Sequence, residues 1–179
     1  MSTYVALLRG INVGGKNMIP MAALRSSLTE LGYEDVVTYI QSGNIVFRSP
    51  RGKADDVAAA IERQISATFG KSVTVIVRTP AELEAIAERN PFLTAAADVS
   101  KLHVVFLASP PAPEAAAGLD PERSPPDEFR LEGREIFLHL PNGMGRSKLS
   151  IDYFERKLRV AATARNWKTL LTLIALAQA

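Results

Sequence analysis

The order of hydrophobic patterns over the first 78 residues constrains the fold more than any other feature of this chain. Strand-like runs occupy residues 4–9, 36–41, 44–47 and 73–78, and stretches with helical spacing of apolar residues occupy 21–31 and 57–69. In chain order these patterns predict β-α-β-β-α-β, the split βαβ or ferredoxin-like arrangement of an α+β domain. Ser42 and Gly43 between the second and third runs predict a two-residue hairpin turn.

The second half of the chain partly repeats this order. Strand-like runs at 102–107, 129–131 and 135–140, a short Ala-rich helix within 109–126 and helices from about 151 and 166 predict β-α-β-β-α-α. We interpret this as a second ferredoxin-like part in which a helix replaces the last strand. The Ala-rich stretch 93–100 predicts a boundary, with domains at 1–95 and 96–179.

Both alternating sets of residues in the first strand are apolar, Tyr4, Ala6 and Leu8 on one side and Val5 and Leu7 on the other. A sheet with helices on one face and water on the other should show a polar set. We therefore expect both faces of the first sheet to be covered, the second of them by the other domain.

Composition excludes several classes of protein. The net charge is only +2, which is low for a dedicated nucleic-acid binder, so a nucleic-acid partner is only weakly supported. Cys is absent, which removes disulfides and thiolate chemistry and fits a cytoplasmic protein. The apolar run 170–177 is far shorter than the ~20 residues that cross a bilayer, and no signal peptide is evident, so we expect no membrane partner.

The first candidate site is a glycine-rich loop after the first strand. Gly10, Gly15 and Lys16 have the G-x-x-x-x-G-K spacing of a phosphate-binding loop, but Asn17 replaces the Ser or Thr that binds Mg²⁺. The helix also begins late, near Pro20, so we do not expect NTPase chemistry. The alternatives are a loop that only shapes the connection and a site for an anion or polar ligand. The candidate ligand-binding residues here are Arg9, Asn12, Gly14, Gly15, Lys16 and Asn17.

A second candidate segment leads from a strand through Gly143 and Gly145 to Arg146, Ser147 and Lys148. Backbone donors and two cations at a predicted helix start suit a phosphate or a carboxylate. The alternative is that Ser147 or Ser150 only caps the helix while both bases face water.

A third candidate segment is 163–168, with Arg165, Asn166 and Trp167. Asn166 is a plausible N-cap. Trp167 is expected to anchor the last helix in the core, and the alternative is that it stacks on a base or a sugar beside Arg165. With Arg146, Ser147 and Lys148, we count Arg165 and Asn166 among the candidate ligand-binding residues.

No catalytic constellation emerges from the sequence, so the catalytic residues are unknown and enzymatic activity is left open. His103 and His139 lie on separate strands without a third ligand in view, so we expect no metal site and no cofactor.

Three motifs resemble one bacterial family across nearly the whole chain. They are YVALLRGINVGGKNMIPM from Tyr4, TYIQSGNIVF from Thr38 and RNWKT from Arg165. The chain is similar to the domain-of-unknown-function family numbered sixteen ninety-seven. The resemblance implies an α+β protein with two ferredoxin-like parts, and it implies no activity.

The sequence therefore predicts an uncharacterised protein that binds an anionic, phosphate-bearing or nucleotide-like ligand in a cleft between its halves. Arg9, Lys16, Arg146, Lys148 and Arg165 would form its positive pocket. The alternatives are a structural or partner-binding module without a small ligand, and an enzyme acting on a phosphorylated small molecule. The oligomeric state is not predicted.

Overall fold

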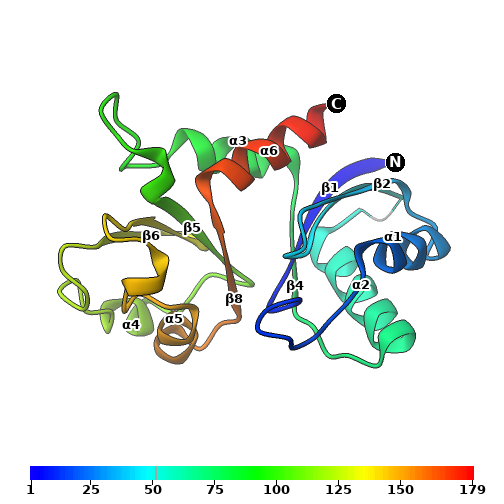
Figure 1. Ribbon diagram of the computed structural model, residues 1–179, viewed down its shortest axis with the longest axis horizontal. Coiled ribbons are helices and arrows are strands. Elements are labelled where there is room, and N and C mark those ends of the chain that lie inside the picture. The colour runs from blue at the N-terminus through cyan, green and yellow to red at the C-terminus, as the bar shows by residue number, and fades with distance from the viewer. Residues whose placement is uncertain (51) are drawn as a thin grey trace. The chain divides into compact units, whose positions relative to one another are not determined.

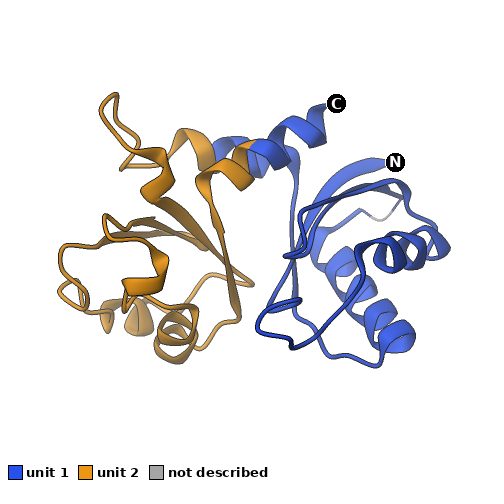
Figure 2. Ribbon diagram, in the orientation of Figure 1, with its two compact units in different colours: residues 1–85, 172–179 blue, residues 86–171 orange. Residues whose placement is uncertain are grey.

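The computed structural model of the chain describes residues 1–50 and 52–179. These residues form two compact units (Figure 2). Unit 1 contains residues 1–85 and 172–179, and unit 2 contains residues 86–171. The predicted domains, 1–95 and 96–179, stay a prediction, because compactness does not test independent folding.

Unit 1 contains one antiparallel sheet and the helices that cover it (Figure 1). In chain order its elements are β1 (Ser2–Leu8), α1 (Met21–Glu30), β2 (Glu34–Tyr39), β3 (Asn44–Ser49), α2 (Ala54–Phe69) and β4 (Val75–Arg78). The sheet order is β2-β3-β1-β4. Helices α1 and α2 lie on the same face of this sheet.

Helical spacing of apolar residues explains the two helices of unit 1. Leu24 and Leu28 of α1, and Ile61 and Ile65 of α2, are buried in one core with alternate residues of the strands. Helix α2 ends at Gly70, whose left-handed backbone lets its N–H donate to the Ser66 carbonyl. The other side of the sheet is also buried, since Val5 and Leu7 are fully enclosed.

The hairpin between β2 and β3 differs from the prediction of a two-residue turn. Tyr39 pairs with Asn44, so the turn contains four residues, 40–43. The Asn44 side chain donates to the Tyr39 carbonyl (3.1 Å) and to Ser42 Oγ (3.0 Å). These bonds stabilise the wider turn and bury Asn44, which periodicity alone does not reveal.

Helix α3 (Pro80–Glu88) follows β4 directly. The Thr79 N–H donates to Glu82 Oε2 (2.8 Å), and the Glu82 N–H donates to Thr79 Oγ1 (3.2 Å). This reciprocal pair is a capping box, which explains why the helix begins at Pro80.

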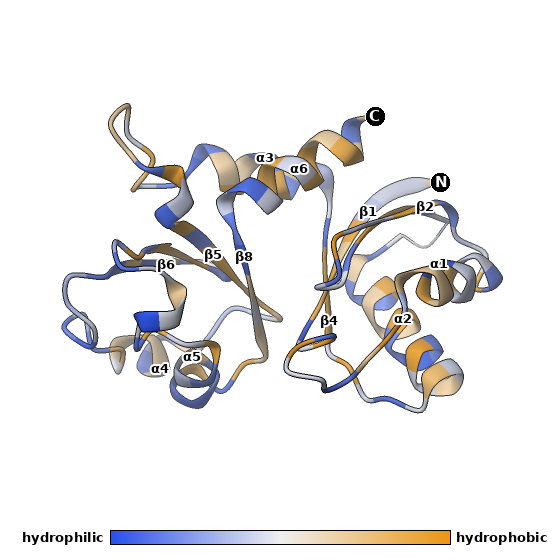
Figure 3. Ribbon diagram, viewed as in Figure 1, coloured by the Kyte–Doolittle hydropathy of each residue, from blue (hydrophilic) through white to orange (hydrophobic). Residues whose placement is uncertain are grey.

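Unit 2 also contains an antiparallel four-stranded sheet. After a 3₁₀ turn, η1 (Val99–Lys101), its elements are β5 (Leu102–Leu107), α4 (Pro113–Ala117), β6 (Glu128–Glu132), β7 (Glu135–His139), η2 (Met144–Arg146), α5 (Ile151–Leu158), β8 (Ala162–Asn166) and α6 (Trp167–Gln178), whose last residues belong to unit 1. The sheet order is β6-β7-β5-β8. Figure 3 shows hydrophobic residues, in orange, along β4 and β5.

The prediction that a helix replaces the last strand of the second part was wrong. Residues 162–166 form β8, which pairs with β5 from Leu107↔Ala162 to His103↔Asn166. Helix α6 begins one residue later, where the Thr169 N–H donates to Asn166 Oδ1 (2.8 Å). The predicted N-cap role of Asn166 is thus confirmed.

Helix α5 and the inward residues of the sheet form the core of unit 2. Tyr153, Phe154 and Leu158 on one side of α5 are buried against alternate residues of β5, β7 and β8.

Among the helices of the described chain, none combines the length and the apolar character that a membrane crossing requires.

Candidate functional site

The glycine-rich loop of unit 1 connects β1 to α1 through a run of left-handed backbone conformations. Its φ angles are positive at Gly10 (67°), Asn12 (54°), Gly14 (57°), Gly15 (74°) and Asn17 (49°). Glycine and asparagine are the residues that adopt this region at least cost, which explains the composition of the loop.

Hydrogen bonds close this loop into a small hairpin. The Lys16 N–H donates to the Val13 carbonyl (3.0 Å), and the Asn12 N–H donates to the Asn17 carbonyl (3.2 Å). Positive φ at both Gly14 and Gly15 is the pattern of a type I′ turn. A phosphate-binding loop instead runs straight into its helix with its N–H groups open. Here two of those donors are occupied, so the geometry does not support a nucleotide-hydrolysing loop.

Asn12 fixes this hairpin to the rest of unit 1. Its Nδ2 donates to the Ile19 carbonyl (3.0 Å) and to the Gln41 carbonyl (2.7 Å), while its Oδ1 accepts from the Ile19 N–H (2.8 Å). Both amide hydrogens are therefore engaged, and the side chain has no donor left for an anion. Asn17 Nδ2 donates to the Gly10 carbonyl at a longer 3.3 Å.

The tip of the β2–β3 hairpin packs against the base of the same loop. Only glycine fits at position 43, because a Cβ there would lie 2.7 Å from Leu8 Cβ and 2.9 Å from Ile11 Cδ1. The Leu8 N–H also donates to the Gly43 carbonyl (2.9 Å). Loop and hairpin tip thus form one structure, from which the Lys16 side chain extends into solvent.

The second candidate segment lies in unit 2, between β7 and α5. Arg146 ends the 3₁₀ turn η2, and α5 begins only at Ile151. The expectation that Arg146, Ser147 and Lys148 stand at the helix start was therefore wrong. Ser150 is the N-cap, because its Oγ accepts from the Tyr153 N–H (3.2 Å). Ser147 Oγ accepts from the Leu149 N–H (3.0 Å), and Arg146 and Lys148 are exposed.

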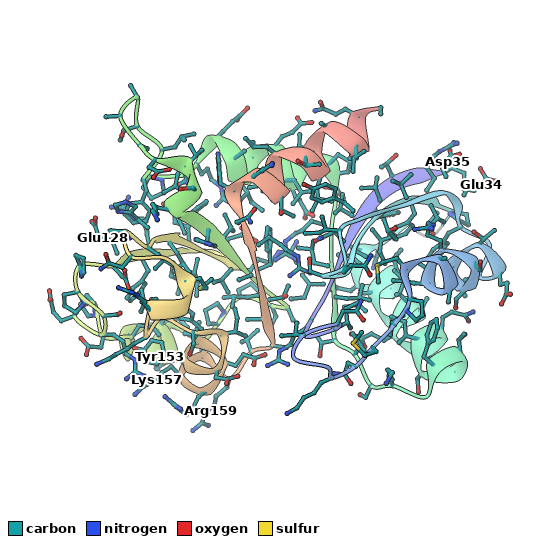
Figure 4. All side chains as sticks on the ribbon, in the orientation of Figure 1. Glu34, Asp35, Glu128, Tyr153, Lys157 and Arg159 are labelled. Atoms are coloured by element: carbon teal, nitrogen blue, oxygen red, sulfur yellow. The ribbon has the colours of Figure 1, made fainter. Side chains whose placement is uncertain are left out.

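Two neighbours of Lys148 come from the segment 109–126, for which the sequence predicted a short helix and no site residue. Arg123 Nε donates to the Lys148 carbonyl (3.3 Å), and the Lys148 N–H donates to Ser124 Oγ (3.0 Å). The Arg123 guanidinium also lies 4.4 Å from the centre of the Tyr153 ring. Tyr153 belongs to α5, as does Lys157 (Figure 4). Arg123 is thus a third cation at this segment, beside Arg146 and Lys148, and no local sequence motif indicates it.

The third candidate segment differs most from its prediction. Arg165 lies in β8 and is buried, with Nη1 donating to Thr163 Oγ1 (2.7 Å) and to the Ala164 carbonyl (2.8 Å). Burial lowers the pKa of Arg165 to about 10, so the group stays charged at neutral pH. Trp167 is 2% exposed, which confirms its core role and rules out stacking on a base.

The structure therefore groups the candidates by unit. Asn12, Gly14, Gly15, Lys16 and Asn17 share one loop in unit 1, next to Arg9 at the end of β1. In unit 2, Arg146, Ser147 and Lys148 share an exposed segment, whereas Arg165 is buried in the sheet and Asn166 caps α6. Their convergence in one pocket stays a prediction.

Two separate ion pairs involve the first and the last residue of β7 in unit 2. Arg89 Nη2 lies 2.8 Å from Glu135 Oε1, and His139 Nδ1 lies 3.4 Å from Glu128 Oε1 with its ring stacked on Phe92. Burial lowers the pKa of His103. Within residues 1–50 and 52–179, no three His, Asp or Glu side chains gather as a metal site would require.

Comparison with known proteins places this geometry in a family without an assigned function. The family described as "Protein of unknown function (DUF1697)" matches residues 1–137. A solved structure, that of the conserved bacterial protein SP0830 from Streptococcus pneumoniae, is 26% identical and superposes with a TM-score of 0.75 over 98% of each chain. No curated protein matches the chain.

Proposed function

We propose that this chain, which belongs to the DUF1697 family of proteins of unknown function, binds an anionic ligand through its glycine-rich loop. The ligand class is a phosphate-bearing small molecule, including nucleotide-like ones. The observation that carries the proposal is that Lys16 stands in solvent on a loop held in one shape by Asn12 and Asn17.

The charge around this loop supports the proposal. Residues 8–29 contain Arg9, Lys16 and Arg25 and have no Asp or Glu. A surface with one sign of charge raises the local concentration of the opposite charge, so an anion is attracted without a dedicated pocket. The exposed Gly14 and Gly15 let a ligand approach the backbone closely.

A second anion-binding segment in unit 2 is part of the same proposal. Arg146 and Lys148 are exposed, and Arg123 is held beside them by the Lys148 carbonyl. The guanidinium of Arg123 is therefore held in place before a ligand arrives, and with the two exposed cations it suits a phosphate or a carboxylate. We also propose that each unit has a ferredoxin-like split βαβ fold. The strand orders β2-β3-β1-β4 and β6-β7-β5-β8 support this assignment.

A thermal-shift screen tests the proposal. The panel contains inorganic phosphate, mononucleotides, dinucleotides, sugar phosphates and short single-stranded RNA. A ligand at a hundred times its Kd stabilises the protein by about 2.7 kcal/mol, which raises the melting temperature by several degrees. We expect this shift to be lost in Lys16→Ala and kept in Lys53→Ala, an exposed lysine of the same unit.

The same screen assigns the second segment and the alternatives. A shift lost in Lys148→Ala but kept in Lys157→Ala would place the ligand in unit 2. A panel that leaves the wild type unchanged would contradict the proposal and favour a partner-binding module. Turnover of a phosphorylated panel compound, lost in Lys16→Ala, would make the protein an enzyme.

A further inference from the structure

The most exposed large apolar side chains of this protein gather at one place. Among the described residues, the large hydrophobic side chains that are more than half exposed are those of Met1, Val13, Met18 and Ile40. Met1 is the chain terminus. The other three, at 61%, 57% and 51%, all belong to the glycine-rich loop and the adjacent hairpin tip of unit 1.

Asn12 brings these three residues together. Val13 follows Asn12 in the chain, Met18 precedes Ile19, and Ile40 precedes Gln41. The Asn12 side chain is hydrogen bonded to both Ile19 and Gln41, at 2.7–3.0 Å. Each exposed side chain is thus one residue away from the same junction. We call Val13, Met18, Ile40 and Lys16 the apolar tip.

The apolar tip is held in shape before it meets any partner. The Val13–Lys16 turn, the Asn12 bonds and the close packing of Gly43 on Leu8 and Ile11 fix the backbone on both sides. A soluble protein that keeps three aliphatic side chains in water on an ordered turn has a surface suited to an apolar partner. A free anion alone would make no use of them.

The charge of the surrounding segment indicates which apolar partner fits. Residues 8–29 have three basic and no acidic residues, and the hairpin tip, 40–43, is uncharged. Apolar side chains that are flanked by basic residues only match the surface of an anionic bilayer, where acyl chains lie beneath phosphate groups. The apolar tip contains no aromatic side chain of the kind that usually anchors a protein–protein interface.

We propose that the apolar tip docks the protein on the surface of an anionic lipid membrane. Val13, Met18 and Ile40 enter the boundary between headgroups and acyl chains, and Lys16 contacts lipid phosphate or carboxylate. The inference rests on the proposed function, because it assigns a lipid headgroup as the anion at Lys16. The inference departs from our expectation of no membrane partner, which rested on the lack of a spanning segment and of a signal peptide; surface docking needs neither.

A second copy of the chain is a poorer occupant for this surface. A symmetric contact between two tips would place Lys16 opposite Lys16, within two segments that lack acidic residues. Like charges that meet across an interface oppose association. Self-association is therefore an outcome that the experiment must distinguish.

Co-sedimentation with vesicles tests the inference. One vesicle contains phosphatidylcholine alone, and the other contains equal parts of phosphatidylcholine and phosphatidylserine. We expect the protein to sediment with the anionic vesicle only. Lys16→Ala should weaken this binding about fivefold, as expected for one cation near an anionic surface. The triple variant Val13→Ser, Met18→Ser and Ile40→Ser should abolish it without lowering the melting temperature, because all three side chains are exposed and Ile40 is strained at its positive φ of 49°.

A fluorescent probe reports the contact directly. The chain has no cysteine, so Val13→Cys carries a single polarity-sensitive label. Its emission should shift to the blue on anionic vesicles, while the label on Leu93→Cys, exposed but far along the sequence, should not respond. No sedimentation, or equal shifts at both positions, would overturn the inference. Dimerisation lost in the triple variant, without vesicle binding, would overturn it in favour of a second copy.

The result is separable from that of the thermal-shift screen. Soluble anions that bind in a Lys16-dependent manner, without vesicle binding, would retain the proposed function and refute membrane docking. Vesicle binding with an unchanged soluble panel would support docking and refute a soluble ligand.

Discussion

Asn12 is the residue on which the shape of the candidate site depends. It is one of the few non-glycine residues with positive φ, and its side chain makes three bonds to the backbone of two other segments. The sequence indicated a polar group in a glycine-rich loop and predicted a ligand contact. What it could not show is that both amide hydrogens are used inside the fold, since these partners are 7 and 29 residues away.

Two substitutions of Asn12 distinguish the stability that its hydrogen bonds provide from the cost of its left-handed backbone conformation. Asn12→Gly keeps the left-handed backbone but loses two partly buried bonds and one exposed bond, so we expect a loss of about 1–3 kcal/mol in the free energy of unfolding. Asn12→Ala should lose about 1 kcal/mol more, from strain at positive φ. Urea unfolding measures both. Asn17→Gly, which loses one exposed bond of 3.3 Å, is the control, and an equal loss there would contradict the role of Asn12.

At the scale of elements, apolar periodicity predicted the helices and most strands. Helices α1 and α2 were predictable because their buried residues recur every three or four positions. The start of α3 is marked by a local pattern, the capping box of Thr79 and Glu82. Strand β8 was missed because its sequence, ATARN, is short, with small and polar residues. It is a strand because it pairs with β5, and the paired residues Val104 and Arg165 are 61 positions apart in the sequence.

The candidate site was predictable only in part, for the same reason. The position of the glycine-rich loop follows from its residues, but the hairpin that closes it depends on backbone hydrogen bonds. Arg123 reaches Lys148 from 25 residues away, so only the fold reveals it. The sequence shows only that three apolar residues, Val13, Met18 and Ile40, stand beside turn-forming residues. That they form an exposed surface becomes evident only from their exposed fractions in the structure.

Helix α6 provides the prediction at this scale. Its first turn is capped by Asn166, which ends β8, so one side chain connects a strand to a helix. We expect Asn166→Ala to destabilise the protein by about 0.5–2 kcal/mol and Asn166→Asp or Asn166→Ser to restore most of the loss. Thermal unfolding with circular dichroism measures it. A loss that Asp and Ser fail to restore would argue that Asn166 acts otherwise than as a cap.

At the scale of the whole molecule, the two units correspond element by element. Numbered within each unit, both sheets have the strand order 2-3-1-4. Arg78 of β4 and Arg165 of β8 are both buried, and each pairs with a valine of the first strand, Val5 and Val104. Each arginine is followed by the capping residue of a helix, Thr79 and Asn166. The sequence showed a similar order of elements but hid this correspondence, because few residues are identical.

The two units also share helices. Helix α3 runs through the boundary at residues 85 and 86, and α6 runs through the boundary at residues 171 and 172. A helix is cooperative, because residues that lose their neighbours in the hydrogen-bond ladder lose the propagation free energy as well. We therefore expect the protein to unfold in one transition rather than in two.

A pair of leucines in α6 tests this cooperativity. Leu173, in the part of the helix that belongs to unit 1, is 1% exposed, and Leu171, in unit 2, is 47% exposed. Leu173→Ala should cost about 2–5 kcal/mol, whereas Leu171→Ala should cost little. Trp167 is the only tryptophan and is buried in unit 2, so its fluorescence reports that unit, while hydrogen exchange in β1 and β3 reports unit 1. If the units unfold together, Leu173→Ala lowers the urea midpoint of both probes equally. If unit 1 loses its protection at a urea concentration that leaves Trp167 fluorescence unchanged, the shared helices do not couple the two units.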